Sequence, residues 1–378
     1  MDSLLEKMLV MEITKNYCED KETIQDVIKN YCNNFNQSPN RTNSSDVLGN
    51  IRKKILKYFD ATNDYDLAFV PSATIGMNIV INTFSKDKNN KIITTNCEHH
   101  CVYRPLEEYG ISYKIVEYMD INQEEHKEKI LNEINENTTA VIMNHGSNVT
   151  GNIYDIESVG KGIKKISNNT LFIVDISQTA GFEDISINDI KADIVIGSAH
   201  KHLYALPGIG YIIYKKELKL EPIYYGGTGK ISSSMKQPRV MPDMLEAGTM
   251  NIVGILALEK SIEIITKELR KKYRKHENEL VNYFLEKSKL IKEIKVYCGK
   301  ENKRTGVISF KIDDLDSNYV VAPYLQNEGN ISVRSGLHCA PIIHKTLKTF
   351  PEGTVRISFS YNNTKEDIDK LIYLLMKL

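Results

Sequence analysis

Short apolar runs that each end in a polar cluster recur through the middle of this 378-residue chain. The runs are Leu67–Val70, Lys91–Thr95, Ala140–Met143, Leu171–Val174 and Asp193–Ile196. Longer helical stretches separate them, which predicts an α/β fold with parallel strands joined by crossover helices. Ligands of open α/β sheets gather beyond the carboxyl ends of the strands. We therefore expect the clusters PSAT, NCEHH, NHGSN, DISQ and GSAHK to meet in one crevice.

The sequence predicts a large domain with a mostly parallel sheet and a smaller α+β domain at the C-terminus. We expect the large domain at 36–250, the small domain at 251–378, and a segment at 1–35 that packs with the small domain. Two glycine-punctuated stretches, 208–214 and 224–230, are predicted to be strands, and 251–289 one or two helices. In the small domain we expect strands around Val307–Ile312 and Gly353–Phe359 and a final helix from Lys365.

Charge and composition narrow the classes of partner. The 49 basic and 49 acidic residues cancel, so no overall field favours nucleic acid or a membrane surface, and we expect small-molecule or protein partners. The N-terminal residues mix acids and bases, unlike a signal peptide, and no stretch reaches the roughly 18 apolar residues of a membrane helix. The six cysteines, at 18, 32, 97, 101, 298 and 339, form no CxxC pair. They are interpreted as reduced thiols of a cytoplasmic protein.

The segment SAHKHLYALPGIG at 198–210 carries the strongest chemical signal. A lysine after a buried strand, here Lys201, can hold pyridoxal 5'-phosphate (PLP) through its amine. An exposed loop lysine is the alternative for Lys201 alone. Asp175 favours the cofactor, because a carboxylate at a strand end can pair with a protonated pyridine nitrogen, although such an aspartate can also cap a helix. Gln178 could then hydrogen-bond the phenolic oxygen of the ring.

These segments resemble those of class V aminotransferases, which are PLP enzymes of fold-type I, and within them the cysteine desulfurase and selenocysteine lyase branch. The resemblance covers most of the chain, from about residue 30 to 370. The family motif S-x-H-K is matched by Ser198, His200 and Lys201 and implies phosphate contacts together with the cofactor lysine. PSATIGMN is similar to the phosphate loop, which makes Ala73 and Thr74 the first residues of a phosphate-binding helix.

Three further segments carry residues that the resemblance assigns to the cofactor. EHHCVYRP at 98–105 implies that His99 stacks on the pyridine ring. SNVTG at 147–151 makes Asn148 a ring contact. EAGTMN at 246–251 implies that Thr249 reaches the phosphate of a neighbouring subunit in a homodimer, although Thr249 could equally cap the helix that follows.

The motif RSGLHCAP at 334–341 points to the reaction. The resemblance makes Cys339 the nucleophile that takes sulfur from the substrate and carries it as a persulfide. A thiolate is needed, so neighbours such as His338 and Arg334 would have to favour the charged sulfur. Arg356 matches the arginine that binds the substrate carboxylate, and Arg334 is a second candidate. Either arginine could instead be an ordinary salt-bridge partner.

Some features point elsewhere or depart from the family. Cys97, His99, His100 and Cys101 lie too close in sequence to surround one tetrahedral zinc ion, so we expect no metal site. The glycines of 224–230 lack the pattern of a P-loop or a dinucleotide fingerprint. The first strand of the family is replaced by VMEITKN, with bulkier Glu12–Lys15, and the family segment GRSGH keeps Arg41, a further substrate-binding candidate, but loses its histidine.

The resemblance thus implies a PLP-dependent cysteine desulfurase that converts L-cysteine to L-alanine and passes sulfur to an acceptor protein or small molecule. A selenocysteine lyase, another amino-acid lyase or an aminotransferase is the alternative among enzymes. A PLP-fold partner protein with weak catalysis is a third possibility.

Overall fold

The computed structural model describes residues 9–10, 25–27, 29, 31, 42–87, 89–118, 122–300 and 303–378, without the side chains of 9–10 and 42–46. The chain forms two compact units. The larger unit contains 16–145 and 155–266, and the smaller contains 1–15, 146–154 and 267–378. The division after residue 266 lies beyond the boundary expected near 250, because α9 (Ile252–Ile264) packs against α3 (Thr42–Tyr58) in the larger unit. No described helix is long and apolar enough to cross a membrane.

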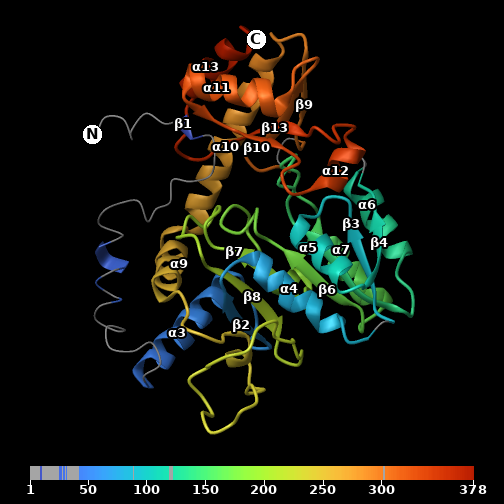
Figure 1. Ribbon diagram of the computed structural model, residues 1–378, viewed down its shortest axis with the longest axis vertical. Helices are drawn as coiled ribbons and strands as arrows, with labels where there is room; N and C mark the ends of the chain where they lie inside the picture. The colour runs from blue at the N-terminus through green and yellow to red at the C-terminus, as the bar shows by residue number, and fades with distance from the viewer. Residues whose placement is uncertain are drawn as a thin grey trace. The chain divides into compact units, whose positions relative to one another are not determined.

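A seven-stranded sheet forms the centre of the larger unit (Figure 1). Its strands are β2 (Tyr65–Val70), β3 (Lys91–Thr95), β4 (Ser112–Val116), β5 (Thr138–Asn144), β6 (Leu171–Asp175), β7 (Ile194–Ser198) and β8 (Gly210–Lys215). The order is β2-β8-β7-β6-β5-β3-β4, and β8 runs antiparallel to both of its neighbours. The five predicted runs and the mostly parallel α/β fold are confirmed. The edge strand β4 was not predicted, because its alternating exposed and half-buried residues lack a continuous apolar run.

The helices of the larger unit follow the strand ends. After α3 come α4 (Ala73–Phe84), α5 (His100–Glu108), α6 (Gln123–Asn132), α7 (Ile156–Ile166), α8 (Ile187–Ile190), a 3-10 turn η2 (Asp243–Leu245) and α9. Helix α4 is apolar along most of its length because it packs on β7 and β8 (Figure 1). The strand predicted at 224–230 was wrong: this glycine-rich segment is largely exposed and pairs with no strand of the sheet.

The smaller unit is an antiparallel sheet packed against helices. Its elements are β1 (Leu9–Val10), α10 (Lys267–Ser288), β9 (Ile294–Tyr297), β10 (Val307–Ile312), a π-helical turn η3 (Ser317–Val321), α11 (Ala322–Gly329), β11 (Ile331–Ser332), β12 (Arg334–Gly336), α12 (Pro341–Thr346), β13 (Thr354–Ser358) and α13 (Lys365–Leu375). The main sheet has the order β12-β13-β10-β9, and β1 pairs in parallel with β11. Phe284, Phe310 and Phe359 join α10 to this sheet in a buried core. The two strands and the final helix predicted here are confirmed.

Candidate active site

The register of the larger sheet brings the polar clusters together at its carboxyl edge, where the parallel strands end. Asp175 at the end of β6 lies beside Asn144 of β5 on one side and Ile196 of β7 on the other. Ser198, which ends β7, pairs with Gly210, and Gly210 pairs in turn with Val70, the last residue of β2. The chemistry-bearing segments after β2, β5, β6 and β7 therefore start from one edge of the sheet, as the strand pattern predicted.

The N-terminus of α4 has the form of an anion site. Ser72 caps the helix, and its hydroxyl oxygen accepts a hydrogen bond from the N–H of Ile75 at 3.3 Å. The N–H groups of Ala73 and Thr74 have no acceptor within the helix, as at every helix start. A Cβ on Gly210 would lie 2.8 Å from the nitrogen of Ala73, so only glycine lets β8 approach this turn. The backbone thus offers donors and a positive dipole end to a phosphate group.

Asp175 is a buried carboxylate at the end of β6. Its exposure is 8%, and Oδ1 accepts a hydrogen bond from the N–H of Ser177 at 2.8 Å. Oδ2 lies 4.0 Å from the sulfur of Cys101. No helix starts here, since α8 begins at Ile187, so Asp175 is not a helix cap. Among the described residues it forms no ion pair, and a buried carboxylate without a cation fits the protonated nitrogen of a pyridine ring.

His99 and His200 are both neutral hydrogen-bonding rings. His99 caps α5, and its Nδ1 accepts a hydrogen bond from the N–H of Cys101 at 3.0 Å, which leaves the proton of the neutral ring on Nε2. Ser198 Oγ and His200 Nδ1 are 2.9 Å apart. Burial, aided by the charge of Lys201, lowers the pKa of His200. Lys201 and Gln178 are half-buried in the turns that follow β7 and β6.

Sequence reasoning missed Glu98, which is fully buried beside these groups. Its Oε1 accepts hydrogen bonds from the Thr95 hydroxyl at 2.6 Å and from the N–H of Asn144 at 3.1 Å. Oε2 has no hydrogen-bond partner in the described part of the chain. Burial raises the pKa of Glu98 to about 8, and the charge of Asp175 adds to the shift. Its place directly before His99 was the only signal in the sequence, and that place does not distinguish a buried acid from an exposed one.

In the smaller unit, Cys339 lies in a turn with an unusual backbone. His338 and Cys339 have φ values of 50° and 58°, so two successive residues are left-handed. The carbonyl oxygen of His338 accepts a hydrogen bond from Asn148 Nδ2 at 2.8 Å. Nη2 of Arg334 lies 3.2 Å from the sulfur of Cys339. The motif therefore places a guanidinium beside its cysteine.

Asn148 belongs to the smaller unit and is held there by close backbone packing. Arg356 Nη1 donates a hydrogen bond to its carbonyl oxygen at 3.0 Å. Three residues on, Gly151 has φ 72°, and a Cβ there would lie 2.4 Å from the carbonyl oxygen of Val307. The glycine of SNVTG thus lets this loop lie against β10. The side chain of Asn148 thus binds the Cys339 turn, and its backbone carbonyl oxygen binds Arg356.

The expectation that His338 supports a charged sulfur was wrong. The imidazole is buried, and its Nε2 lies 3.0 Å from the hydroxyl of Thr354. Burial, together with the charge of Arg356, lowers the pKa of His338 to about 2. A neutral ring contributes no positive charge, so the cation beside the sulfur is Arg334.

Two arginines lie directly opposite each other on neighbouring strands. Arg334 of β12 pairs with Arg356 of β13 in the antiparallel register. Like charges in this position repel and destabilise a sheet unless an anion lies between them. Arg334 is exposed and Arg356 is half-buried, so both are within reach of solvent. The pair is therefore a candidate carboxylate site, as the motifs predicted.

The described cysteines differ in their ability to act as nucleophiles. Cys97 and Cys101 are buried, and burial together with the charge of Asp175 raises the pKa of Cys101 well above its usual value. Burial also raises the pKa of Cys298, although Arg304 Nη1 lies 3.8 Å from its sulfur. Cys339 is half-buried with a guanidinium nitrogen at 3.2 Å. The predicted nucleophile is thus the described thiol best placed to react.

Thr249 is exposed in a loop that a buried ion pair attaches to the sheet. Arg52 Nη2 lies 2.6 Å from Glu246 Oε2, while Glu246 Oε1 accepts a hydrogen bond from the N–H of Phe69 in β2 at 2.8 Å. Helix α9 is capped by Asn251, whose side chain accepts from the N–H of Gly254, so Thr249 is not its cap. Sequence reasoning missed this ion pair, because Arg52 and Glu246 are 194 residues apart.

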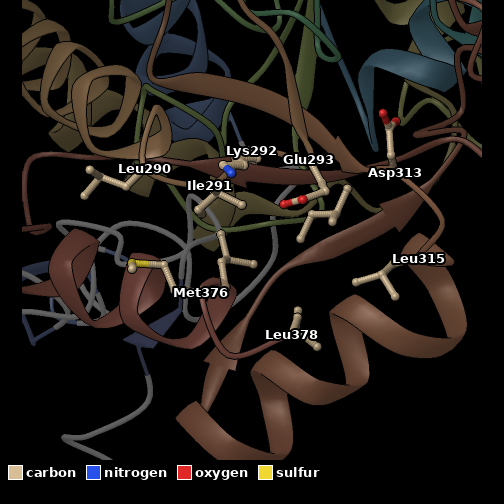
Figure 2. Close-up of a pocket in the computed structure, with 10 residues that line it drawn as sticks. Leu290, Ile291, Lys292, Glu293, Asp313, Leu315, Met376 and Leu378 are labelled. Atoms are coloured by element: carbon tan, nitrogen blue, oxygen red, sulfur yellow. The ribbon is translucent and has the colours of Figure 1, made fainter.

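In the described part of the chain, each unit has a pocket lined by its own residues. One of about 190 Å³ in the larger unit is lined by Thr249, Gly208, Val70 and Tyr224 among others. One of about 500 Å³ in the smaller unit is mostly aliphatic, with Lys292, Glu293 and Asp313 among its lining residues (Figure 2). The second pocket contains no cysteine, histidine or arginine, and so does not fit the predicted chemistry. Arg41 and Glu12–Lys15 lie outside the described residues.

The chain is similar to known proteins in both sequence and fold. A cysteine desulfurase of Wigglesworthia glossinidia brevipalpis is 33% identical over 349 residues, covering 89% of this chain and 83% of that protein. A probable cysteine desulfurase of Pyrococcus abyssi is 30% identical over 86% of this chain and 82% of its own length. The apo structure of a cysteine desulfurase from Thermococcus onnurineus NA1 has a TM-score of 0.82 and 25% identity, covering 99% of this chain and 95% of that one. The aminotransferase class-V family matches residues 20–371, and the chain belongs to that family.

Proposed function

We propose that the protein is a PLP-dependent cysteine desulfurase that converts L-cysteine to L-alanine and carries the sulfur as a persulfide on Cys339. The observation that carries the proposal is the contact of 3.2 Å between the Arg334 guanidinium and the sulfur of Cys339. The names of relatives at 28–33% identity support it. Aminotransferases and lyases of the same fold need the cofactor groups but no such nucleophile.

The residues at the edge of the larger sheet fit PLP. Lys201 would hold the cofactor through its amine and Asp175 would pair with the ring nitrogen. His99 would stack on the ring, Gln178 would contact its phenolic oxygen, and Asn148 of the smaller unit is a further ring contact in this proposal. The phosphate would be bound by the N–H groups of Ala73 and Thr74 with Ser198 and His200. When bound, PLP supplies an electron sink that stabilises negative charge on the substrate carbon skeleton.

The paired arginines would orient the substrate. Arg356 and Arg334 lie opposite each other, and a carboxylate between them relieves their repulsion. A guanidinium binds a carboxylate through two parallel hydrogen bonds, which fixes its direction as well as its position. The amino acid would thus be held by its carboxylate, and its side chain would be left for the sulfur chemistry.

Cys339 would then perform the transfer. Its thiolate forms a new S–S bond with the substrate sulfur, while the bond from that sulfur to carbon breaks and its electron pair stays on the carbon. Protonation of this carbon yields alanine, and Cys339 keeps the extra sulfur as a persulfide. An acceptor thiol, of a protein or a small molecule, removes that sulfur by attack on the persulfide.

A homodimer is part of the proposal. Thr249 is exposed and is not used as a helix cap, which leaves its hydroxyl available to the phosphate of a second subunit. The adjoining segment exposes Tyr225, Ile231, Met235 and Val240, and large exposed apolar side chains often mark subunit contacts. Light scattering should show a dimer whose dilution releases PLP. The cysteine pattern, without a CxxC pair, favours a cytoplasmic location for this enzyme.

Mass spectrometry tests the proposed reaction. Protein given L-cysteine without reductant should gain one sulfur on the peptide that contains Cys339, and dithiothreitol should remove it. Alanine should form in step with that sulfur. A persulfide on another cysteine, or keto-acid formation without any persulfide, would leave the lyase or aminotransferase alternative ahead.

A further inference from the structure

Cys101 makes two contacts with groups that the proposed function assigns to the cofactor. Its backbone N–H donates to Nδ1 of His99 at 3.0 Å, and its sulfur lies 4.0 Å from Oδ2 of Asp175. Any residue could make the first contact, because it uses the backbone. The second depends on the thiol. Oδ1 of Asp175 accepts from the N–H of Ser177, and among the described residues Cys101 supplies the side chain that meets Oδ2.

The surroundings keep this thiol in the form that can donate. Cys101 is 6% exposed, and Asp175 and Glu98 are acidic groups near it. Burial, together with the charges of Asp175 and Glu98, raises the pKa of the Cys101 thiol, although the nearby charge of Lys201 acts in the opposite direction. A thiol that keeps its proton can direct its S–H toward a carboxylate, although sulfur is a weak donor.

We propose that Cys101 is a positioning residue for the cofactor: its thiol directs Asp175 so that the carboxylate faces the ring nitrogen. This inference rests on the proposed function, because it requires PLP at Asp175. The competing role is space filling, since a buried cysteine often acts as a small apolar side chain. The two roles differ in their dependence on the negative charge of Asp175.

Cys101→Ala and Cys101→Ser, which differ by one hydroxyl, test the donor role. Equilibrium binding of PLP to the apo-protein is the measurement. We expect Cys101→Ala to bind PLP about fivefold more weakly, the size of one weak hydrogen bond to a charged group, and Cys101→Ser to recover at least half of that loss. Cys97→Ala is the matched control, because it removes another buried thiol, which lies just before α5 and whose sulfur contacts Asn96 Oδ1 at 3.3 Å. This variant should bind PLP like the original protein.

A double-mutant cycle with Asp175→Asn separates positioning from packing. If the thiol acts through the carboxylate, Cys101→Ala should have no further effect on PLP binding in the Asp175→Asn protein. An equal loss in both backgrounds, equal binding by the alanine and serine variants, or no loss in Cys101→Ala would each overturn the inference while leaving the proposed function intact. Failure of the unmodified protein to bind PLP would instead refute the proposed function, and the inference with it.

Discussion

The carboxyl edge of the larger sheet and the turn that holds Cys339 position their reactive groups by different means. Asp175 and Ser198 are the last residues of strands, so the hydrogen-bond ladder of the sheet fixes their backbone. Cys339 lies between β12 and α12, where its own backbone and that of His338 have positive φ. That turn depends on side chains: Asn148 binds the carbonyl oxygen of His338, and Thr354 lies beside its ring.

The two regions should therefore tolerate different amino-acid substitutions. At the sheet edge, a change of side-chain chemistry should alter function with little effect on the backbone. In the turn, the loss of one supporting contact should disturb both stability and the placement of Cys339, because left-handed residues other than glycine store strain that the surroundings must offset. Substitutions in each region test this difference.

The largest effect is expected for Cys339→Ala. Removal of a covalent nucleophile should reduce alanine formation from L-cysteine by at least about 1000-fold, while PLP binding stays unchanged. Product assays and PLP titration of the same preparation measure both. Cys298→Ala is the control, because it removes another half-buried thiol of the smaller unit. Undiminished alanine formation in Cys339→Ala would show that the turn serves no transfer role.

Asp175→Asn should reduce turnover by about 10- to 150-fold, since a neutral amide of the same shape cannot stabilise a pyridinium. This range corresponds to the loss of one hydrogen bond to a charged group, about 1.5–3 kcal/mol. The unfolding midpoint in urea should change little, because the ladder of β6 is unaltered. A large loss of stability would contradict the idea that the sheet alone fixes this residue. Unchanged turnover would remove Asp175 as the ring partner.

The two regions also differ in how far the sequence predicts them. The strand runs before Asp175 and Lys201 are local patterns, so the fold and the residues at the sheet edge could be inferred without a structure. Glu98 could not, because its buried state depends on Thr95 and on Asn144 of another strand. The neutral state of His338 was likewise unpredictable, since it comes from burial against residues such as Thr354. The failed strand at 224–230 shows that glycine spacing alone does not establish a partner strand.

Glu98→Gln should show how much the ionisation of a buried acid lowers the free energy of unfolding. The folded protein holds the pKa of Glu98 at about 8, above the ordinary value of 4.5, so the unfolded chain loses this proton first as pH rises. Stability should therefore fall between pH 4.5 and 8 and level off above that window. Glutamine cannot ionise. The variant should be close in stability to the original protein near pH 5 and more stable by about 4 kcal/mol near pH 8.

Urea unfolding at both pH values measures the effect, with Glu246→Gln as the contrast. Burial raises the pKa of Glu246 as well, but its carboxylate is paired with Arg52. Its neutralisation leaves a half-buried guanidinium without its carboxylate and should destabilise the protein. An equal response of the two variants would contradict the distinction between an unpaired and a paired buried acid. A flat difference between pH 5 and pH 8 for Glu98→Gln would show that Glu98 is ionised throughout.

The smallest effect is expected for Thr354→Val, which tests the support of the turn most directly. The change removes the hydroxyl 3.0 Å from Nε2 of His338 and should cost about 1 kcal/mol of unfolding free energy, the size of one hydrogen bond. Thr349→Val is the matched control, since it removes the hydroxyl 2.7 Å from Nδ1 of the neighbouring buried His344. Urea unfolding should show similar losses for both variants. Only Thr354→Val should also slow persulfide formation on Cys339, because His338 directly precedes that residue in the strained turn. Equal slowing by both variants would mean that the turn responds to general stability, and no slowing by either would mean that the backbone holds Cys339 without its side-chain supports.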